Sequence, residues 1–145
     1  MGDRAVITAS KSKDKGVGIY LHWYGDLPVV LALIDTAKRL GYRSPEHDET
    51  YGMARLCGLA CVLSGIRSEV GIGIGELSQL DCNNYDNGTY VIGGNWELVD
   101  RWGSGSGAFD ADAQRVARAS AYYSDVIDEI AKQLDKVDQP QGDET

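Results

Sequence analysis

A change in hydrophobic period near the N-terminus most constrains the fold of this chain. The segments 4–9 and 17–24 are rich in β-branched and aromatic residues, with bulky side chains at alternate positions in the second. This pattern predicts two strands of an N-terminal hairpin. After Gly25, the apolar residues recur at helical spacing instead, from Asp26 as the N-cap residue to a stop at Gly41. Strand and helix patterns in one short chain indicate an α+β domain.

The later apolar segments continue this mixture of helix and strand. A second helix is expected over about 50–64, with a stop at Gly65. Strands are expected over 70–75, 89–92 and 96–102, and the last two are joined as a hairpin. The predicted fold is therefore an α+β domain, with a mixed or antiparallel sheet of about four to five strands packed by two helices.

A run rich in glycine and serine divides the chain near residue 103. The sequence over 103–109 predicts a linker between a compact domain over 1–102 and a long acidic helix over 110–138. Residues 139–145 are expected to be disordered. Apolar residues recur along the helix with a seven-residue period, and this stripe is expected to pack either across the sheet or on a partner helix. The two rows of the stripe are Val116, Tyr123, Ile130 and Val137, then Ser120, Ile127 and Leu134.

The negative charge of the chain is concentrated in its second half. The sequence has 14 basic and 22 acidic residues and a net charge of −8 at pH 7, and nearly all of the excess lies after Gly75. An acidic chain lacks the cations that displace phosphate counterions, which argues against direct nucleic-acid binding and against anionic membranes. The asymmetry fits an acidic face with a basic partner. It also fits a solvated face that serves solubility.

The pattern contains no export or membrane segment. No apolar run approaches the roughly 20 residues of a membrane span, and the N-terminus has no apolar signal core, so a cytoplasmic location is expected. Cys57, Cys61 and Cys82 are then reduced thiols, the first two packed in the core. The alternative is a zinc site that joins these thiols to His22 or His47. We expect no cofactor and no metal.

Two loops imitate ligand-binding motifs without matching them. Gly71, Gly73 and Gly75 have the spacing G-x-G-x-G, which lacks the third glycine of a dinucleotide loop. The polar segment 81–88 has the composition of a calcium loop, but its oxygen-bearing side chains are out of register with an EF-hand. We interpret it as a polar turn that precedes a strand.

Six short stretches form a recognisable set. They are MGDRAVIT at 1–8, GIYLHW at 18–23, YRSP at 42–45, YGMARLC at 51–57, LDCNNYDNG at 80–88 and Trp96-Glu97. Together they resemble a family of small phage and prophage proteins of unassigned biochemistry. The resemblance covers about residues 1–102, and the residues beyond look like an extension. The family favours an aromatic residue where this chain has Met53, and no catalytic residue carries over from it.

The resemblance implies a protein that a mobile genetic element makes inside a bacterium. Many such proteins disable host defence machinery, and acidic ones, among them anti-CRISPR proteins, often occupy basic nucleic-acid grooves. Spaced carboxylates can replace the phosphates that a basic cleft binds. The leading hypothesis is therefore an anti-CRISPR-like inhibitor, without enzymatic activity, that binds the basic surface of a nucleic-acid-dependent defence complex.

The predicted partner-binding residues are acids of the second half of the chain. They are Asp81, Asp86, Glu97, Asp100, Asp125, Asp128, Glu129 and Asp135. A homodimer through the apolar stripe of the C-terminal helix is a further hypothesis.

Two other functions compete with this hypothesis. A protein that binds a small molecule such as a signalling nucleotide would use the bare glycine face of 70–75 together with nearby aromatic residues. The candidate pocket consists of Tyr20, His22, Tyr24, Gly71, Gly73 and Gly75. A small enzyme would instead use His22 as a general base with Cys57 or Cys82 as the nucleophile.

Overall fold

The structure is a computed structural model that describes residues 3–64 and 71–138. Three predictions fall outside these residues: the helix stop at Gly65, the strand position Val70 and the disordered tail. The elements in chain order are β1 (Ala5–Thr8), β2 (Val17–Leu21), α1 (Leu27–Arg39), α2 (Glu49–Ser64), β3 (Ile72–Glu76), the 3-10 turn η1 (Leu77–Gln79), β4 (Thr89–Ile92), the 3-10 turn η2 (Gly94–Trp96), β5 (Leu98–Trp102), α3 (Ala111–Arg118) and α4 (Ala121–Asp138).

The five strands form one mixed sheet in the order β3-β2-β1-β4-β5. β1 runs antiparallel to β2 and β4 runs antiparallel to β5, which confirms both predicted hairpins. The hairpins meet through the parallel pairing of β1 with β4, and β3 pairs with the outer side of β2. The α+β class and the mixed five-stranded sheet are therefore as predicted.

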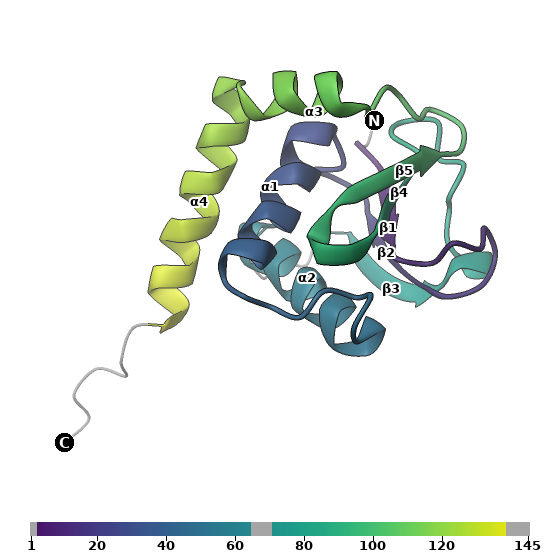
Figure 1. Cartoon of the computed structure of the whole chain (residues 1–145), viewed down its shortest axis with the longest axis horizontal. Coiled ribbons are helices and arrows are strands. Elements are labelled where there is room, and N and C mark those ends of the chain that lie inside the picture. Colours follow the sequence, from purple (N-terminus) through teal and green to yellow (C-terminus); the bar gives the residue numbers. More distant parts are fainter. Residues whose placement is uncertain (1–2, 65–70, 139–145) are drawn as a thin grey trace.

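Helix α1 is buried on nearly all sides. Every residue from Val29 to Ile34 is buried, which is typical of a helix inside a domain rather than on its surface. These residues share one apolar cluster with Ile7, Ile19 and Tyr90 of the sheet, and α1 also contacts α2, α3 and α4. Figure 1 shows the helices gathered on one side of the sheet, with α4 along the outer side of α1.

Asp26 occupies the predicted N-cap position of α1 but caps it through its backbone. Its carbonyl oxygen accepts hydrogen bonds from the N–H groups of Val29 and Val30, both at 3.1 Å, and its carboxylate makes no capping bond. Pro28 lies in the first turn, where a missing N–H costs little. The carboxylate of Asp26 is thus directed to other neighbours.

The opposite face of the sheet carries a smaller apolar cluster. Side chains alternate along a strand, so Val6 lies on the face away from Ile7. Val6 is buried with Leu77 and Cys82, and Trp102 packs against them from β5. The segment that follows β3 therefore covers this face of the sheet.

The predicted strand over 96–102 begins later, at Leu98. Asn95 and Trp96 have positive φ angles of 56° and 60°, which extended strands do not allow. The indole of Trp96 is buried, and its Nε1–H donates to the carbonyl oxygen of Tyr42 at 2.9 Å. This bond ties η2 to the loop after α1, and the strand starts only after the turn.

The predicted single helix over 110–138 consists of two helices. The Asp110 carboxylate caps α3 by accepting a hydrogen bond from the N–H of Ala113 at 2.9 Å. The chain turns at Ala119 and Ser120, where the hydroxyl of Ser120 accepts from the N–H of Tyr123 at 3.1 Å. Such a hydroxyl cap starts a new helix rather than continuing the old one.

The corner between α3 and α4 is tied to α1 through one carboxylate. The guanidinium of Arg118 donates to both oxygens of Asp35, at 2.7 and 2.8 Å. The hydroxyl of Tyr123 donates to the same carboxylate at 2.7 Å. A bidentate arginine pair of this kind fixes orientation as well as contact.

The apolar stripe of α4 packs inside the chain. Ile130 is fully buried, and Tyr123, Ile127 and Leu134 pack against the same main core. The stripe contacts α1 and α2 rather than the sheet. Most of the stripe is therefore not available as a surface for a homodimer. Val116 on α3 is the described stripe residue that is more than half exposed.

The buried stripe generates a stability prediction. Replacing Ile130 by Ala should lower the free energy of unfolding by about 2–4 kcal/mol, because the change leaves a cavity in the core. Val116→Ala on exposed α3 should cost less than about 0.5 kcal/mol. Urea unfolding followed by circular dichroism measures both values, and equal losses for the two variants would contradict the packing described.

Candidate functional site

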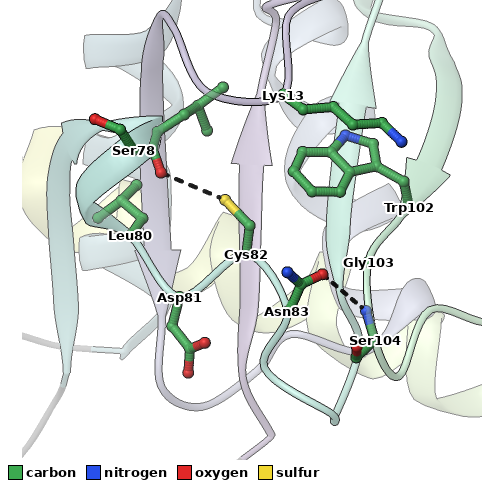
Figure 2. Close-up of a pocket in the computed structure, with 10 residues that line it drawn as sticks. Lys13, Ser78, Leu80, Asp81, Cys82, Asn83, Trp102, Gly103 and Ser104 are labelled. Atoms are coloured by element: carbon green, nitrogen blue, oxygen red, sulfur yellow. Dashed lines mark hydrogen bonds between the residues drawn. The ribbon is translucent and has the colours of Figure 1, made fainter.

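A hollow of about 730 Å³ opens on the sheet face that the helices leave free. Its walls come from three parts of the chain that are far apart in sequence: Lys13, the segment 77–83 and the segment 102–104. Figure 2 shows the indole of Trp102 along one side, with the side chain of Lys13 above it. The Nζ atom of Lys13 is 5.2 Å from the indole centroid, which is a cation–π contact.

The floor of the hollow is formed by Cys82 and Asn83. The thiol of Cys82 is buried and donates to the carbonyl oxygen of Leu77 at 3.6 Å. The Oδ1 atom of Asn83 accepts from the N–H of Ser104 at 3.2 Å. Figure 2 shows the amide nitrogen of Asn83 on the side toward Cys82.

The loop behind this floor is built around one buried amide. The Nδ2 atom of Asn84 donates to the carbonyl oxygens of Asp81 and Gly88, both at 3.0 Å. Its Oδ1 atom accepts from the N–H groups of Asp86, Asn87 and Gly88, at 2.9 to 3.1 Å. This side chain satisfies the backbone groups of a tight loop. The interpretation of 81–88 as a polar turn agrees with this geometry.

The predicted Gly/Ser linker is an ordered loop packed on the 81–88 turn. Gly103 and Gly105 have φ angles of +95° and +92°, and a Cβ on Gly103 would lie 2.5 Å from the carbonyl oxygen of Cys82. The carbonyl oxygen of Ser104 accepts from the N–H of Tyr85 at 2.9 Å. The glycines are therefore required by close approach and backbone conformation, so this run forms a wall of the site.

Arg4 partners two of the predicted binding acids. Its Nε atom lies 2.7 Å from Asp86 and its Nη1 atom 3.4 Å from Asp81. The hydrogen bond from the Arg4 side chain, with a second from its backbone N–H, lowers the pKa of Asp86. Asp81 lines the hollow and shares its arginine partner with Asp86, so both acids are already paired with a cation.

The other two predicted acids of this region lie on and beside β5. Glu97 is exposed, with Oε1 3.5 Å from the Nζ atom of Lys38. Asp100 is exposed, and its Oδ1 atom accepts from the backbone N–H of Arg101 at 2.8 Å. The structure brings Asp81 and Asp86 together, whereas Glu97 is tied to the end of α1.

The four predicted acids of α4 lie on one side of that helix, which also carries the exposed side chains of Lys132 and Lys136. Asp125, Asp128 and Asp135 are exposed, and Glu129 is half-buried with Oε2 accepting from Gln133 at 2.6 Å. Within residues 3–64 and 71–138, no basic nitrogen lies within 4.0 Å of these carboxylates. The acids near Arg4 and Lys38, in contrast, form ion pairs with those side chains.

Only some residues of the predicted aromatic–glycine pocket lie close together in the fold. Tyr20 pairs with Gly73 across β2 and β3, and its hydroxyl lies 3.0 Å from Nδ1 of His22. Gly71 packs against His22, since a Cβ there would come within 2.7 Å of the histidine Cβ. Tyr24 instead lines a hollow beside α4, and Gly75 lies beside Leu80. These residues do not share the hollows that are lined by Trp102, Tyr42, Tyr24 or Tyr123.

Cys82 is placed apart from the other two cysteines in the fold. Cys57 and Cys61 lie half-buried on α2, while Cys82 is buried under the other face of the sheet. Burial, with Cys61 as a neighbour, raises the pKa of the Cys57 thiol, which keeps it protonated and weakly nucleophilic. Over residues 3–64 and 71–138, no group of three His, Cys, Asp or Glu side chains could hold a metal ion.

A carboxylate pair that the sequence pattern did not single out lies where β1 and α1 begin. Burial, and then the neighbouring Asp3 carboxylate, raise the pKa of Asp26 to about 6. The Oδ1 atom of Asp26 is buried without a hydrogen-bond partner. Asp3 accepts from Nδ2 of Asn87 at 2.6 Å, and the Asn87 carbonyl oxygen accepts from Arg101 at 3.0 Å. Asp3 and Asp26 are separated by a whole hairpin, so sequence spacing contains no signal for the pair.

Comparison of the chain with protein-family models, with curated proteins and with solved structures finds no match. Among the described helices, none is both long and apolar enough to cross a membrane. The resemblance to phage and prophage proteins thus remains an expectation from the sequence.

The Asp26 pair predicts a specific pH dependence of stability. Its pKa is higher in the folded chain than its usual value near 3.8, so folding favours the protonated form, and stability falls as the pH rises from about 4 to 6. Asp26→Asn should therefore stabilise the fold at pH 7.5, by about 1–2 kcal/mol once solvent screening of this partly exposed group is included. The gain should shrink toward pH 4.

Urea unfolding of both proteins at pH 4 and pH 7.5 measures this effect. Asp100→Asn, which removes an exposed acid, should leave the pH profile unchanged. If Asp26→Asn stabilised the fold equally at both pH values, ionisation of the Asp26 carboxylate would not be the cause of the gain.

Proposed function

We propose that the protein is an inhibitor of phage or prophage type that binds a bacterial nucleic-acid-dependent defence complex, as anti-CRISPR proteins do. It acts by binding a basic surface of that complex in the cytoplasm of the host cell. It makes no direct contact with nucleic acid or membrane. The observation that carries the proposal is the division of α4 into an apolar side and an acidic side.

One side of α4 packs in the core, and the other side carries exposed acids. At about 3.6 residues per turn, Asp125, Asp128 and Asp135 fall on the side of α4 away from the buried Ile130. The apolar side is fixed in the main core, so the carboxylates are held at defined spacing over about 15 Å of helix axis. Carboxylates ordered in this way lose little freedom on binding and complement a basic groove.

A hollow of about 420 Å³ beside this acidic side suits a basic side chain. It is lined by the carboxylates of Asp125 and Glu129, by the apolar side chains of Leu63 and Val126, and by Tyr24. An arginine or lysine of the partner could pack its aliphatic stem on the apolar residues and its charge on the acids. The tyrosine ring offers a further contact for the cation.

The acids near the β4–β5 hairpin form a second, weaker contact surface in this proposal. Arg4 already neutralises Asp81 and Asp86, and Lys38 lies beside Glu97. A partner would have to compete with these cations, which reduces the gain from a new ion pair. Asp100, in the middle of β5, is exposed, and its carboxylate accepts from the adjacent backbone rather than from a cation.

The proposal is tested by phage plating on strains that each carry one nucleic-acid-guided defence system. Expression of the protein should raise the plating efficiency of a targeted phage by at least about 100-fold against one such system. The triple variant Asp125→Asn, Asp128→Asn and Asp135→Asn should lower that rescue by about ten-fold or more, because several charge contacts are lost together. Full rescue by the triple variant would remove α4 from the interface.

A charge-matched control separates site from net charge. Asp14, Glu46 and Asp112 are exposed acids outside both acidic surfaces, and their neutralisation changes the net charge by the same amount. This control variant should keep the rescue of the unmodified protein. Failure of the unmodified protein to protect phage against any of these systems would overturn the proposed function.

A further inference from the structure

We propose that the hollow shown in Figure 2 is a binding site for a nucleoside phosphate, separate from the acidic surface of α4. Its volume of about 730 Å³ lies within the range of about 300–1,000 Å³ that is usual for small-molecule sites. The proposal rests on three adjacent features: an aromatic platform, a lysine on an exposed loop and a rim of hydrogen-bonding side chains.

The aromatic platform is the indole of Trp102. It packs against the buried cluster of Val6, Leu77 and Cys82, so the ring is held in place while part of it lines the hollow. Nucleobases stack on such rings whatever their identity, because every base has a π face. The ammonium group of Lys13 lies over this ring in the structure, and a stacked base would displace it.

The displaced lysine belongs to a loop suited to a phosphate. Residues 11–15 read Lys-Ser-Lys-Asp-Lys, and all three lysines are exposed. The base of the loop is fixed beside the hollow, because the N–H of Gly16 donates to Glu76 at 3.1 Å and the carbonyl oxygen of Gly16 accepts from Leu77 at 2.9 Å. Lys13 can therefore exchange its contact with the indole for a charge-assisted contact with phosphate while staying at the rim.

The remaining rim supplies groups for a sugar and a base edge. Asn83 lines the hollow, and in Figure 2 its amide nitrogen lies on the side toward Cys82, while its oxygen accepts from the N–H of Ser104. The hydroxyl groups of Ser78 and Ser104 belong to residues that line the hollow. Asp81 also lines it and is held by Arg4 at 3.4 Å, so its carboxylate can accept hydrogen bonds from ribose hydroxyls.

The charge around the hollow favours a small ligand over a polymer. Lys13 and Asp81 line the hollow, and Arg4 pairs with Asp81 and Asp86, so the charges of these four residues cancel, whereas the chain as a whole carries −8. A ligand with one or two phosphates gains from the lysine loop without meeting the acidic remainder. A long polyanion would be repelled.

The inference is tested by titrating the full-length protein with AMP, adenosine and inorganic phosphate, each followed by calorimetry and by the amide and indole NMR signals. AMP should bind saturably and shift the indole N–H signal of Trp102. Adenosine should bind about ten-fold more weakly, and inorganic phosphate more weakly still. Phosphate that binds as tightly as AMP would overturn the proposal, as would the absence of saturable AMP binding at millimolar concentrations.

Matched variants assign the roles of the two main residues. Trp102→Leu keeps an apolar side chain over the cluster but removes the ring, and should weaken AMP binding about ten-fold. Trp102→Phe, which keeps an aromatic face, should restore most of the affinity. Lys13→Gln should weaken AMP about ten-fold and adenosine less than two-fold. Lys132→Gln changes an exposed lysine of α4 that does not line the hollow, and this control should change neither affinity by more than about two-fold.

Circular dichroism of each variant shows whether the fold is retained. An AMP affinity within two-fold of the unmodified protein in both folded Trp102→Leu and Lys13→Gln would overturn the site. These titrations need no defence complex, so their outcome is independent of the phage-plating test.

Discussion

The burial of helix α1 is the constraint on which the rest of the structure depends. A run of apolar residues from Val29 to Ile34 has no polar side to turn to solvent, so the helix needs partners all round. The sheet supplies one side, and α2, α3 and α4 supply the others. The C-terminal helices are for this reason part of the core, and the acidic side of α4 is displayed on a rigid support.

The second face of the sheet is organised by polar loops rather than by helices. One buried amide, that of Asn84, holds the turn over 81–88 through five hydrogen bonds. The glycine- and serine-rich run over 103–107 then packs on that turn through Gly103 and Gly105. The hollow beside Trp102 exists because two loops that look flexible in the sequence are locked together.

The acidic residues that give the net charge of −8 have different roles at different places in the fold. Asp86 and Asp81 neutralise Arg4, Asp35 holds the corner of α3 and α4, and Asp26 is partly buried beside Asp3. These acids make contacts that hold parts of the fold together. The carboxylates on the outer side of α4 make no ion pair among the described residues, and this difference supports the proposal that they contact a partner protein.

Local sequence pattern determined the helices and strands of this protein, and the tertiary structure decided which of their residues lie together in a site. Both hairpins, α1, α2 and the α+β class follow from period and turn signals, because these depend on neighbours within one or two turns of chain. The acids of α4 were named from the excess of negative charge after Gly75, and their role in binding is a proposal. Sequence reasoning could not find the pairing of Arg4 with Asp86, which are 82 residues apart, nor the contact of Lys13 with Trp102. Such contacts depend on the order of strands in the sheet, which brings distant segments to one edge, and no local period records that order.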